Sequence, residues 1–305
     1  MSNAPDTPRS GILLVDKPQG ITSHDAVSRT RRLAGTKKVG HAGTLDPMAT
    51  GLLMLGIGSS TRLLTFLVGL DKEYTATIRL GASTTTDDAE GETTATTDAT
   101  GLDPARIAEG IARLTGPIEQ VPSTVSAIKV NGKRAYALAR AGEEVALKAR
   151  GVTISAFEVL GEPLPAGQAL DLDVRVVCSS GTYIRALARD LGGDLGVGGH
   201  LTALRRTRVG PFSVADALVL PKRGVELDIA PLLREAADVA ATLFPTINAD
   251  ADTVRALENG QRVELPGAET SADPVAIIAP DGHLVGLVTI KAGRARVLVN
   301  FPTGA

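Results

Sequence analysis

The chain has 305 residues, of which 43% are hydrophobic, but only 3% are aromatic and tryptophan is absent. This length is sufficient for one large domain, with or without a small one, and the core must be aliphatic. The single cysteine, Cys178, excludes an intramolecular disulfide and a multi-cysteine metal site, and its apolar neighbours predict a buried, inert thiol. No apolar run approaches the roughly 20 residues that span a bilayer, and the N-terminus lacks a signal-peptide pattern. We therefore expect a cytoplasmic protein with no membrane partner.

The net charge of −2 does not itself indicate a nucleic-acid partner, but the charged residues are segregated along the chain. Lysine and arginine cluster at residues 29–38, 129–150 and 205–208, whereas acids concentrate at 87–92 and 226–258. Such segregation can give a near-neutral protein a basic face that suits a nucleic acid. An ordinary solvated surface explains any one cluster equally well, so this alternative stays open.

The first 80 residues show clear signals for helices and strands. Residues 1–10 are polar and predict a disordered tail. A short buried strand follows at 11–15, and Thr22 or Ser23 then caps a helix that ends at Leu33. The next predicted elements are a strand at 52–55, a helix that starts at Ser59 and carries Leu63 to Leu67, and a β-rich strand at 72–80.

The middle of the chain alternates less regularly. Residues 83–101 are rich in Thr, Asp, Gly and Ala and predict a loop, and Asp103-Pro104 begins a helix that ends near Leu114. The elements expected after it are a strand at 126–130, a tight turn at Asn131-Gly132, a basic helix containing Tyr136, strands at 152–160 and 169–178, a helix at 183–191 and a strand at 200–209.

The C-terminal part of the chain is predicted to form a small separate domain. A helix is expected at 230–243, and Phe244-Pro245 marks a boundary before a small β-rich domain at 245–305. This domain is expected to hold a helix at 251–258 and strands near 275–279, 284–290 and 295–300. Because strands often follow one another directly, we predict an α+β fold with a mixed, mostly antiparallel central sheet and flanking helices.

The loop Val39 to Gly51 holds one histidine and one carboxylate among three glycines, between a basic helix and an apolar strand. Asp46 stands directly before Pro47, and on this pair alone the commoner structure is a helix N-cap. The other interpretations are that Asp46 is a nucleophile held on sharply turning backbone, or that it is both a cap and a catalyst. The pair does not decide between them.

Other residues are candidates because their types are scarce or oddly placed. Tyr74 lies on the strand at 72–80, and Tyr183 begins a helix that also carries Arg185. Each tyrosine is otherwise a half-buried core residue. An arginine in an Ala- and Leu-rich helix needs a carboxylate partner, for which Asp46 and Asp88 are the candidates. No phosphate-binding loop, dinucleotide fingerprint or paired-histidine zinc motif occurs.

Six ordered motifs between about residues 11 and 215 resemble the TruB family of tRNA pseudouridine synthases. The segment Gly40-His41-Ala42-Gly43-Thr44-Leu45-Asp46-Pro47-x-Ala49-Thr50-Gly51 is similar to the family's active-site signature. The others are Asp16-Lys17-Pro18-x-Gly20-x-Thr22-Ser23, Lys72-x-Tyr74-x-Ala76, Thr84-x-Thr86-x-Asp88-x-x-Gly91, Ser179-x-Gly181-Thr182-Tyr183-Ile184-Arg185 and Leu201-x-x-Leu204-Arg205-Arg206.

The resemblance implies a pseudouridine synthase fold and conversion of uridine to pseudouridine at position 55 in the T-loop of tRNA. It implies a catalytic domain at 11–244, in which residues 124–150 clamp the RNA, and a PUA-like RNA-binding domain at 245–305. The partner is the T-stem-loop of tRNA, and the protein is expected to be a monomer. No cofactor or metal is implied, because bonds break and form within one nucleotide.

The resemblance also implies roles for individual residues. Asp46 is the nucleophile, Arg185 its ion-pair partner, and Tyr74 stacks on the target base and takes part in removal of the C5 proton. His41 fills the space that the flipped base leaves. The remaining substrate-binding residues are Lys17, Asp88, Tyr183 and Leu204.

Two rival functions remain. One is a tRNA-binding or tRNA-folding protein in which catalysis is secondary, which the basic stretches and the C-terminal domain favour. The other is a nucleoside or glycoside hydrolase that uses Asp46, which normally requires a second, acidic carboxyl group nearby.

Overall fold

The computed structural model describes residues 10–123, 129–130, 133–134 and 148–301. Nearly all of the expected tail at 1–10 and most of the expected clamp at 124–150 therefore lie outside the described residues, including the predicted turn at Asn131-Gly132 and the helix containing Tyr136. Within the clamp, β8 (Lys129–Val130) pairs antiparallel with β9 (Lys133–Arg134).

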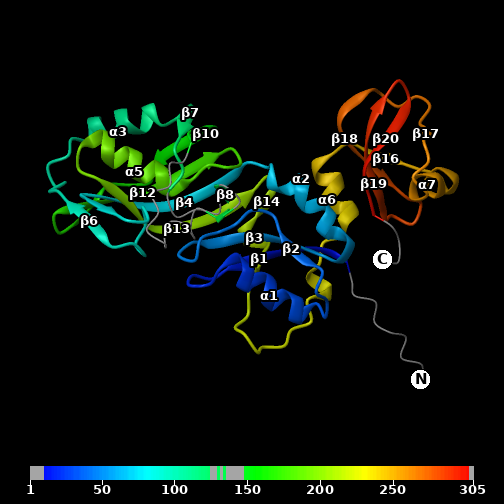
Figure 1. Cartoon of the computed structure of the whole chain (residues 1–305), viewed down its shortest axis with the longest axis horizontal. Helices are drawn as coiled ribbons and strands as arrows, with labels where there is room; N and C mark the ends of the chain where they lie inside the picture. Colours follow the sequence, from blue (N-terminus) through cyan, green and yellow to red (C-terminus); the bar gives the residue numbers. More distant parts are fainter. Residues whose placement is uncertain (1–9, 124–128, 131–132, 135–147, 302–305) are drawn as a thin grey trace. The chain divides into compact units, whose positions relative to one another are not determined.

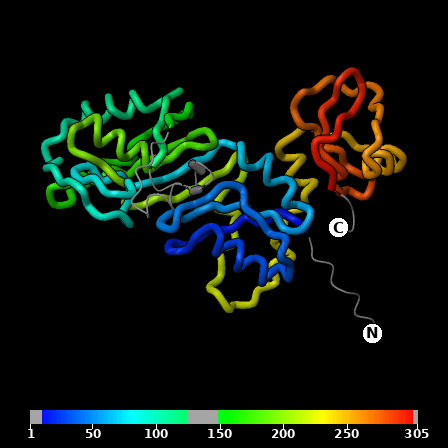
Figure 2. Tube along the Cα trace, viewed as in Figure 1, coloured from blue at the N-terminus to red at the C-terminus, as the bar shows by residue number. Residues whose placement is uncertain are grey.

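The chain divides into two compact units, which Figures 1 and 2 trace in colour from the N-terminus to the C-terminus. One unit comprises residues 1–46, 52–68 and 211–305, and the other comprises residues 47–51 and 69–210. The chain passes between the units at the peptide bond after Asp46 and again after Gly51.

The unit that contains residues 69–210 is built on an antiparallel sheet. Its strand order is β13-β4-β12-β10-β7, and β4 has an antiparallel neighbour on each side. Alternate residues of β4 are buried, as its sequence pattern predicts. The strands are β4 (Lys72–Leu80), β7 (Gly116–Gln120), β10 (Arg150–Val159), β11 (Leu164–Ala166), which pairs with β12, β12 (Ala169–Cys178) and β13 (Gly199–Val209).

Two helices of this unit pack against its strands. α3 (Pro104–Arg113) contacts β10 and α5 (Ile184–Leu195), and α5 contacts β4 and β13 (Figure 1). The side chain of Asp103 caps α3 by accepting a hydrogen bond from the Ala105 N–H at 2.9 Å, as the Asp-Pro pair predicts. A separate hairpin is formed by β5 (Ala82–Thr84) and β6 (Thr93–Thr96).

The other unit begins with β1 (Gly11–Lys17), which pairs in parallel with β15 (Leu218–Val219). α1 (Ser23–Leu33) follows, and Thr22 and Asp25 form a capping box at its first turn. β2 (Val39–His41) then pairs antiparallel with β3 (Thr50–Ile57). The next elements are the 3-10 helix η1 (Gly58–Leu63), α2 (Leu64–Val68), β14 (Phe212–Ser213) and the 3-10 helix η2 (Val214–Asp216).

The C-terminal part of this unit has a five-stranded sheet and its own hydrophobic cluster. The strand order is β16-β18-β19-β20-β17, and buried residues such as Leu257, Ile277 and Val288 form the cluster. The elements are α6 (Ala236–Leu243), β16 (Thr246–Asn248), α7 (Ala251–Glu258), β17 (Val263–Glu264), β18 (Ser271–Ile278), β19 (Leu284–Lys291) and β20 (Arg294–Asn300).

The predicted fold class is confirmed: the protein is α+β, with mixed and mostly antiparallel strands and a β-rich C-terminal part. The single helix predicted at 230–243 is wrong. It is divided into η3 (Ala230–Leu232) and α6, because the Arg234 backbone forms two hydrogen bonds of 2.9 Å with Ile12. No helix in the described part of the chain is long and apolar enough to cross a membrane.

Candidate active site

The loop that carries Asp46 joins β2 to β3. Pairing of His41 with Leu55 ends the hairpin ladder, and the Ala42 N–H donates to the Met54 carbonyl at 2.9 Å. Asp46 is partly exposed, and the turn that follows it at Pro47 leads into β3 at Thr50. The helix-cap interpretation of Asp46 is therefore wrong, because the described chain continues into a strand rather than a helix.

The first residue of α1 holds this loop from its own unit. The Ser23 hydroxyl accepts a hydrogen bond from the Leu45 N–H at 2.8 Å and donates to the Leu45 carbonyl at 3.0 Å. Ser23 and Leu45 are both buried. The capping box at Thr22 thus fixes the helix start, and the helix start fixes the backbone immediately before Asp46.

Gly51 fixes the backbone on the other side of Asp46. Thr50 and Gly51 pair in parallel with Arg205 and Arg206 of β13. Gly51 has φ +102°, and a Cβ at this position would overlap the Arg206 backbone, with the Arg206 N only 2.7 Å away. Only glycine combines this dihedral with so close an approach between backbones.

Two further predicted site residues, Lys17 and His41, lie at the ends of strands in the unit that contains Asp46. Lys17, at the end of β1, is fully buried, and its Nζ donates to the carbonyls of Pro18 at 3.0 Å and Ile21 at 2.8 Å. The ammonium group therefore holds the turn between β1 and α1. His41, the last residue of β2, is partly exposed.

Tyr74 lies at the centre of the other unit's sheet. It is 7% exposed, and on β4 it pairs with Val176 of β12 on one side and Arg206 of β13 on the other. Leu204, also 7% exposed, pairs with Ala76 two residues further along β4. The predicted base-stacking residue is therefore carried by a strand with neighbours on both edges.

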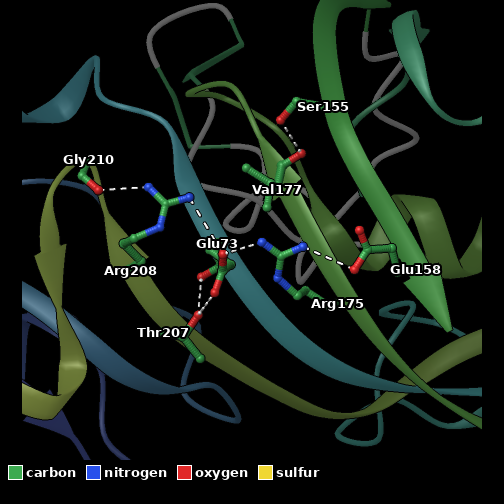
Figure 3. Close-up of polar contacts among 8 residues, drawn as sticks. All are labelled: Glu73, Ser155, Glu158, Arg175, Val177, Thr207, Arg208 and Gly210. Carbon is green, nitrogen blue, oxygen red and sulfur yellow. Dashed lines mark hydrogen bonds and ion pairs between the residues drawn. The ribbon is translucent and has the colours of Figure 1, made fainter. Parts of the chain in front are cut away.

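An ionic network surrounds the residue before Tyr74. Figure 3 shows the Glu73 carboxylate between two arginines: Arg175 Nη2 lies 2.8 Å away and Arg208 Nη2 lies 3.6 Å away. Thr207 Oγ1 donates to the same carboxylate at 3.0 Å. Burial would raise the pKa of Glu73, but the hydrogen bonds from Arg175 and Thr207 outweigh it and lower the pKa. The ionised network ties β4 to both neighbouring strands.

Arg185 and Asp88 form a buried ion pair. Arg185 Nη1 lies 3.4 Å from Asp88 Oδ2, and both side chains are at most 4% exposed. The same nitrogen donates to the Thr86 carbonyl at 2.8 Å, and the Glu90 N–H donates to Asp88 Oδ1 at 3.1 Å. Of the two carboxylates that the sequence left open for Arg185, the structure thus identifies Asp88 as a partner.

Gln120 is a site residue that the sequence analysis missed. It is 1% exposed, and its amide group forms two hydrogen bonds with the Tyr183 backbone: Oε1 accepts from the N–H at 2.8 Å, and Nε2 donates to the carbonyl at 3.1 Å. Tyr183 is the N-terminal flanking residue of α5 and is partly exposed. A lone glutamine at a strand end has no sequence signal that distinguishes this role.

The predicted site residues thus divide between the units: Lys17, His41 and Asp46 belong to one, and Tyr74, Asp88, Tyr183, Arg185 and Leu204 belong to the other. Cys178 is 1% exposed, so the prediction of a buried thiol is confirmed, and burial raises the pKa of this thiol to about 11. Its strand partner Lys72 is 6% exposed, and burial together with the nearby Arg206 charge lowers the Lys72 pKa to about 8.

Solved structures share this architecture across almost the whole chain. A chain of a Cbf5–Nop10–Gar1 complex superposes with a TM-score of 0.70 at 26% identity, and the match covers 96% of this chain and 85% of that one. A chain of an H/ACA RNP bound to a substrate RNA containing 2'-deoxyuridine gives a TM-score of 0.70 at 24% identity. The fold is that of a pseudouridine synthase.

Family models and relatives identify the family. The TruB family pseudouridylate synthase N-terminal domain matches residues 31–184, the tRNA pseudouridylate synthase B C-terminal domain matches 185–222, and the tRNA pseudouridine synthase II C-terminal model matches 244–302. Proteins named tRNA pseudouridine synthase B are 60% identical in Leifsonia xyli subsp. xyli, over 96% of this chain and 97% of that protein, and 54% identical in an Arthrobacter species, over 96% of each.

The chain therefore belongs to the TruB family of pseudouridylate synthases. Members of this family are isomerases that convert uridine to pseudouridine. The resemblance drawn from the six sequence motifs is confirmed, as is the prediction of a tRNA pseudouridine synthase.

Proposed function

We propose that this enzyme converts uridine to pseudouridine at position 55 in the T-loop of tRNA, with Asp46 as its nucleophile. The observation that carries the proposal is the loop between β2 and β3, which presents a partly exposed carboxylate on backbone fixed by Ser23 before it and Gly51 after it. The relatives named tRNA pseudouridine synthase B support tRNA as the substrate.

The reaction needs one carboxylate and a held base. The C1′–N1 bond breaks, the uracil turns while it stays bound, and C5 then joins C1′. A base takes the C5 proton and N1 gains a proton, so the product is an isomer of the substrate. The Asp46 carboxylate acts as the nucleophile, as in a retaining glycosidase, or as a base. Arg185 keeps Asp46 ionised and aimed, and Asp88 holds the guanidinium in place for this role.

The base must leave its stack before it reacts, at a cost of a few kcal/mol. In the proposal Tyr74 stacks on the uracil, Tyr183 and Leu204 wall its pocket, and Lys17 supports the pocket from β1. His41 occupies the space that the base vacates in the RNA. Rigid support for Tyr74 is consistent with the Glu73 network on its strand.

The proposed division of labour follows the domain boundaries expected from the sequence. Residues 11–244 carry the catalytic residues, 124–150 clamp the T-loop through phosphate contacts, and 245–305 bind RNA. We propose a monomer that acts in the cytoplasm, and no cofactor is required for a rearrangement within one nucleotide.

The test is incubation of unmodified tRNA transcripts with the wild type and with Asp46→Asn, followed by mapping of pseudouridine. We expect product at position 55 with the wild type alone, and tRNA binding by both proteins. Release of free uracil would identify a hydrolase, and binding without any product from the wild type would identify a tRNA-binding or tRNA-folding protein.

Two further variants examine the assigned roles. Arg185→Lys keeps the charge but not the planar guanidinium with its fixed donors, so we expect kcat to fall much more than tRNA affinity. His41→Ala should slow the reaction on folded tRNA more than on an unstructured fragment that contains the same uridine. A primary binding defect in Arg185→Lys, or equal losses for His41→Ala on both substrates, would contradict these roles.

A further inference from the structure

A basic hollow lies between α1 and the segment 221–225, which follows β15. In Figure 1 this segment belongs to the yellow-green loop that passes beside α1. The volume of the hollow is about 400 Å³, and we call it the α1 groove. The charged residues that line it are Asp25, Arg29, Arg32, Lys222 and Arg223. Four cations thus face one carboxylate, on a protein whose overall net charge is −2.

Among the described residues that line the α1 groove, only the Asp25 carboxylate offsets the positive charge. Arg29 Nη1 donates to the Pro221 carbonyl at 3.3 Å, which joins the two walls without removing charge. Arg32, Lys222 and Arg223 are exposed and form no ion pair among the described residues. Asp25 Oδ2 accepts hydrogen bonds from the Thr22 N–H at 2.9 Å and the Thr22 hydroxyl at 2.6 Å, so the helix cap engages this oxygen.

The arrangement suits a chain of phosphates better than one enclosed anion. A site for a single small anion needs buried donors that converge on it, whereas three of these cations are exposed along an open surface. Guanidinium groups match phosphate oxygens in a bidentate geometry, and contacts of this kind position nucleic acid without reading its sequence. A polyanion with regularly spaced charges therefore fits the α1 groove.

The same helix connects the α1 groove to the loop of Asp46. Ser23, at the start of α1, forms both hydrogen bonds to Leu45. Arg32 lies nine residues further along the helix, which corresponds to about 14 Å at about 1.5 Å per residue. One RNA molecule can span this distance while its uridine is bound elsewhere on the protein.

We propose that the α1 groove binds the sugar–phosphate backbone of the RNA substrate at a second position, away from the nucleotide that reacts. This inference rests on the proposed function, because it takes the substrate to be a folded RNA larger than the reacting loop. It assigns Arg32, Lys222 and Arg223 to substrate binding and not to the chemical step.

The test compares two charge-matched double variants. Arg32→Gln with Arg223→Gln removes two cations from the α1 groove, and Arg106→Gln with Arg113→Gln removes two exposed cations from α3. Binding of full-length tRNA, of an isolated T-arm hairpin and of inorganic phosphate is measured across a salt series. Pseudouridine formation at saturating tRNA is measured in parallel.

Loss of two phosphate contacts should weaken binding of full-length tRNA about tenfold and make the slope of log affinity against log salt shallower by about 1.5. The α3 double variant should change neither, and kcat at saturating tRNA should stay unchanged in both. Equal losses in the two double variants, or none in either, would overturn the inference. So would displacement of tRNA by low concentrations of inorganic phosphate, which would identify a site for free phosphate.

Failure of the proposed function has a different signature. If the wild type forms no pseudouridine in tRNA but the α1 groove variant alone loses RNA affinity, the groove remains an RNA site and the proposed substrate is wrong. If the wild type modifies tRNA and both double variants bind it normally, the groove inference alone is wrong.

Discussion

The Arg185–Asp88 pair is buried, whereas the Arg79–Asp171 pair of the same unit is partly exposed, with side-chain exposures of 37% and 20%. Asp88→Asn removes one charged partner of the buried guanidinium, and removal of one member of a buried pair costs about 3–5 kcal/mol. We expect the free energy of unfolding, measured by urea denaturation, to fall by about 3 kcal/mol.

Asp171→Asn is the control, because the bidentate pair that Asp171 forms with Arg79 is partly exposed and its loss should cost about 1 kcal/mol, less than the loss of a buried pair. An equal and small effect from both substitutions would show that Asp88 does not stabilise Arg185.

Lys72 gives the protein a pH-dependent stability. Its pKa is about 8 in the folded protein and returns towards its ordinary value of 10.5 on unfolding. The unfolded chain therefore binds more protons between these values, so the contribution of Lys72 to the free energy of unfolding rises with pH from about 8 to about 10.5. The expected rise is about 1–3 kcal/mol.

The rise is measured as the difference between the wild type and Lys72→Met at about pH 7 and about pH 10. Cys178 interacts with the Lys72 charge, and its raised pKa has the opposite effect at alkaline pH, so alanine replaces it in both proteins. A difference that does not change with pH would contradict a lowered pKa for Lys72.

At the scale of elements, the parallel pairing of β3 with β13 depends on one glycine, Gly51. Gly51→Ala would place a methyl group against the Arg206 backbone at a positive φ, and the two effects together should cost at least about 3 kcal/mol. We expect a clear fall in Tm and loss of activity. Gly69→Ala is the control, because no atom lies within 4 Å of its added Cβ.

Elements with local signals were predicted well, and elements defined by distant partners were not. Thr22 caps α1 and alternation marks β4, so both were predicted nearly to their observed ends. The predicted helix at 230–243 failed because Ile12, more than 200 residues earlier, engages the Arg234 backbone. The β5–β6 hairpin was missed because its Thr-rich strands form within a segment that has the composition of a loop.

The candidate site was likewise predicted where local motifs mark its residues, but not where contacts join residues far apart in the sequence. The motifs named Arg185 and both candidate carboxylates, but no local pattern could show that Asp88 lies beside the guanidinium. The support that Gln120 gives to the Tyr183 backbone joins residues 63 positions apart, so it was equally invisible in the sequence.

At the scale of the whole molecule, the C-terminal part has a hydrophobic cluster of its own, and every residue proposed to act in the reaction lies outside it. Deletion of residues 245–305 should therefore raise KM for full-length tRNA and leave kcat within about threefold of the wild type, because phosphate contacts govern affinity more than chemistry. Steady-state kinetics on tRNA transcripts measures both constants.

The truncated protein, which lacks residues 245–305, must first show one cooperative melting transition, because α6 contacts β18 and β19 in the full chain. A collapse of kcat in a variant that melts cooperatively would contradict a role confined to RNA binding.

The position of β4 between two strands also has a consequence for hydrogen exchange around Tyr74. The amides of β4 lie in a ladder with partners on both edges, so their exchange with solvent hydrogen requires opening of the sheet. The chain from Ala42 to Ala49 lies between strands, and hydrogen bonds at Ala42 and Leu45 restrain it. We therefore expect the amides of β4 around Tyr74 to exchange hydrogen with solvent more slowly than the amides of the Asp46 loop.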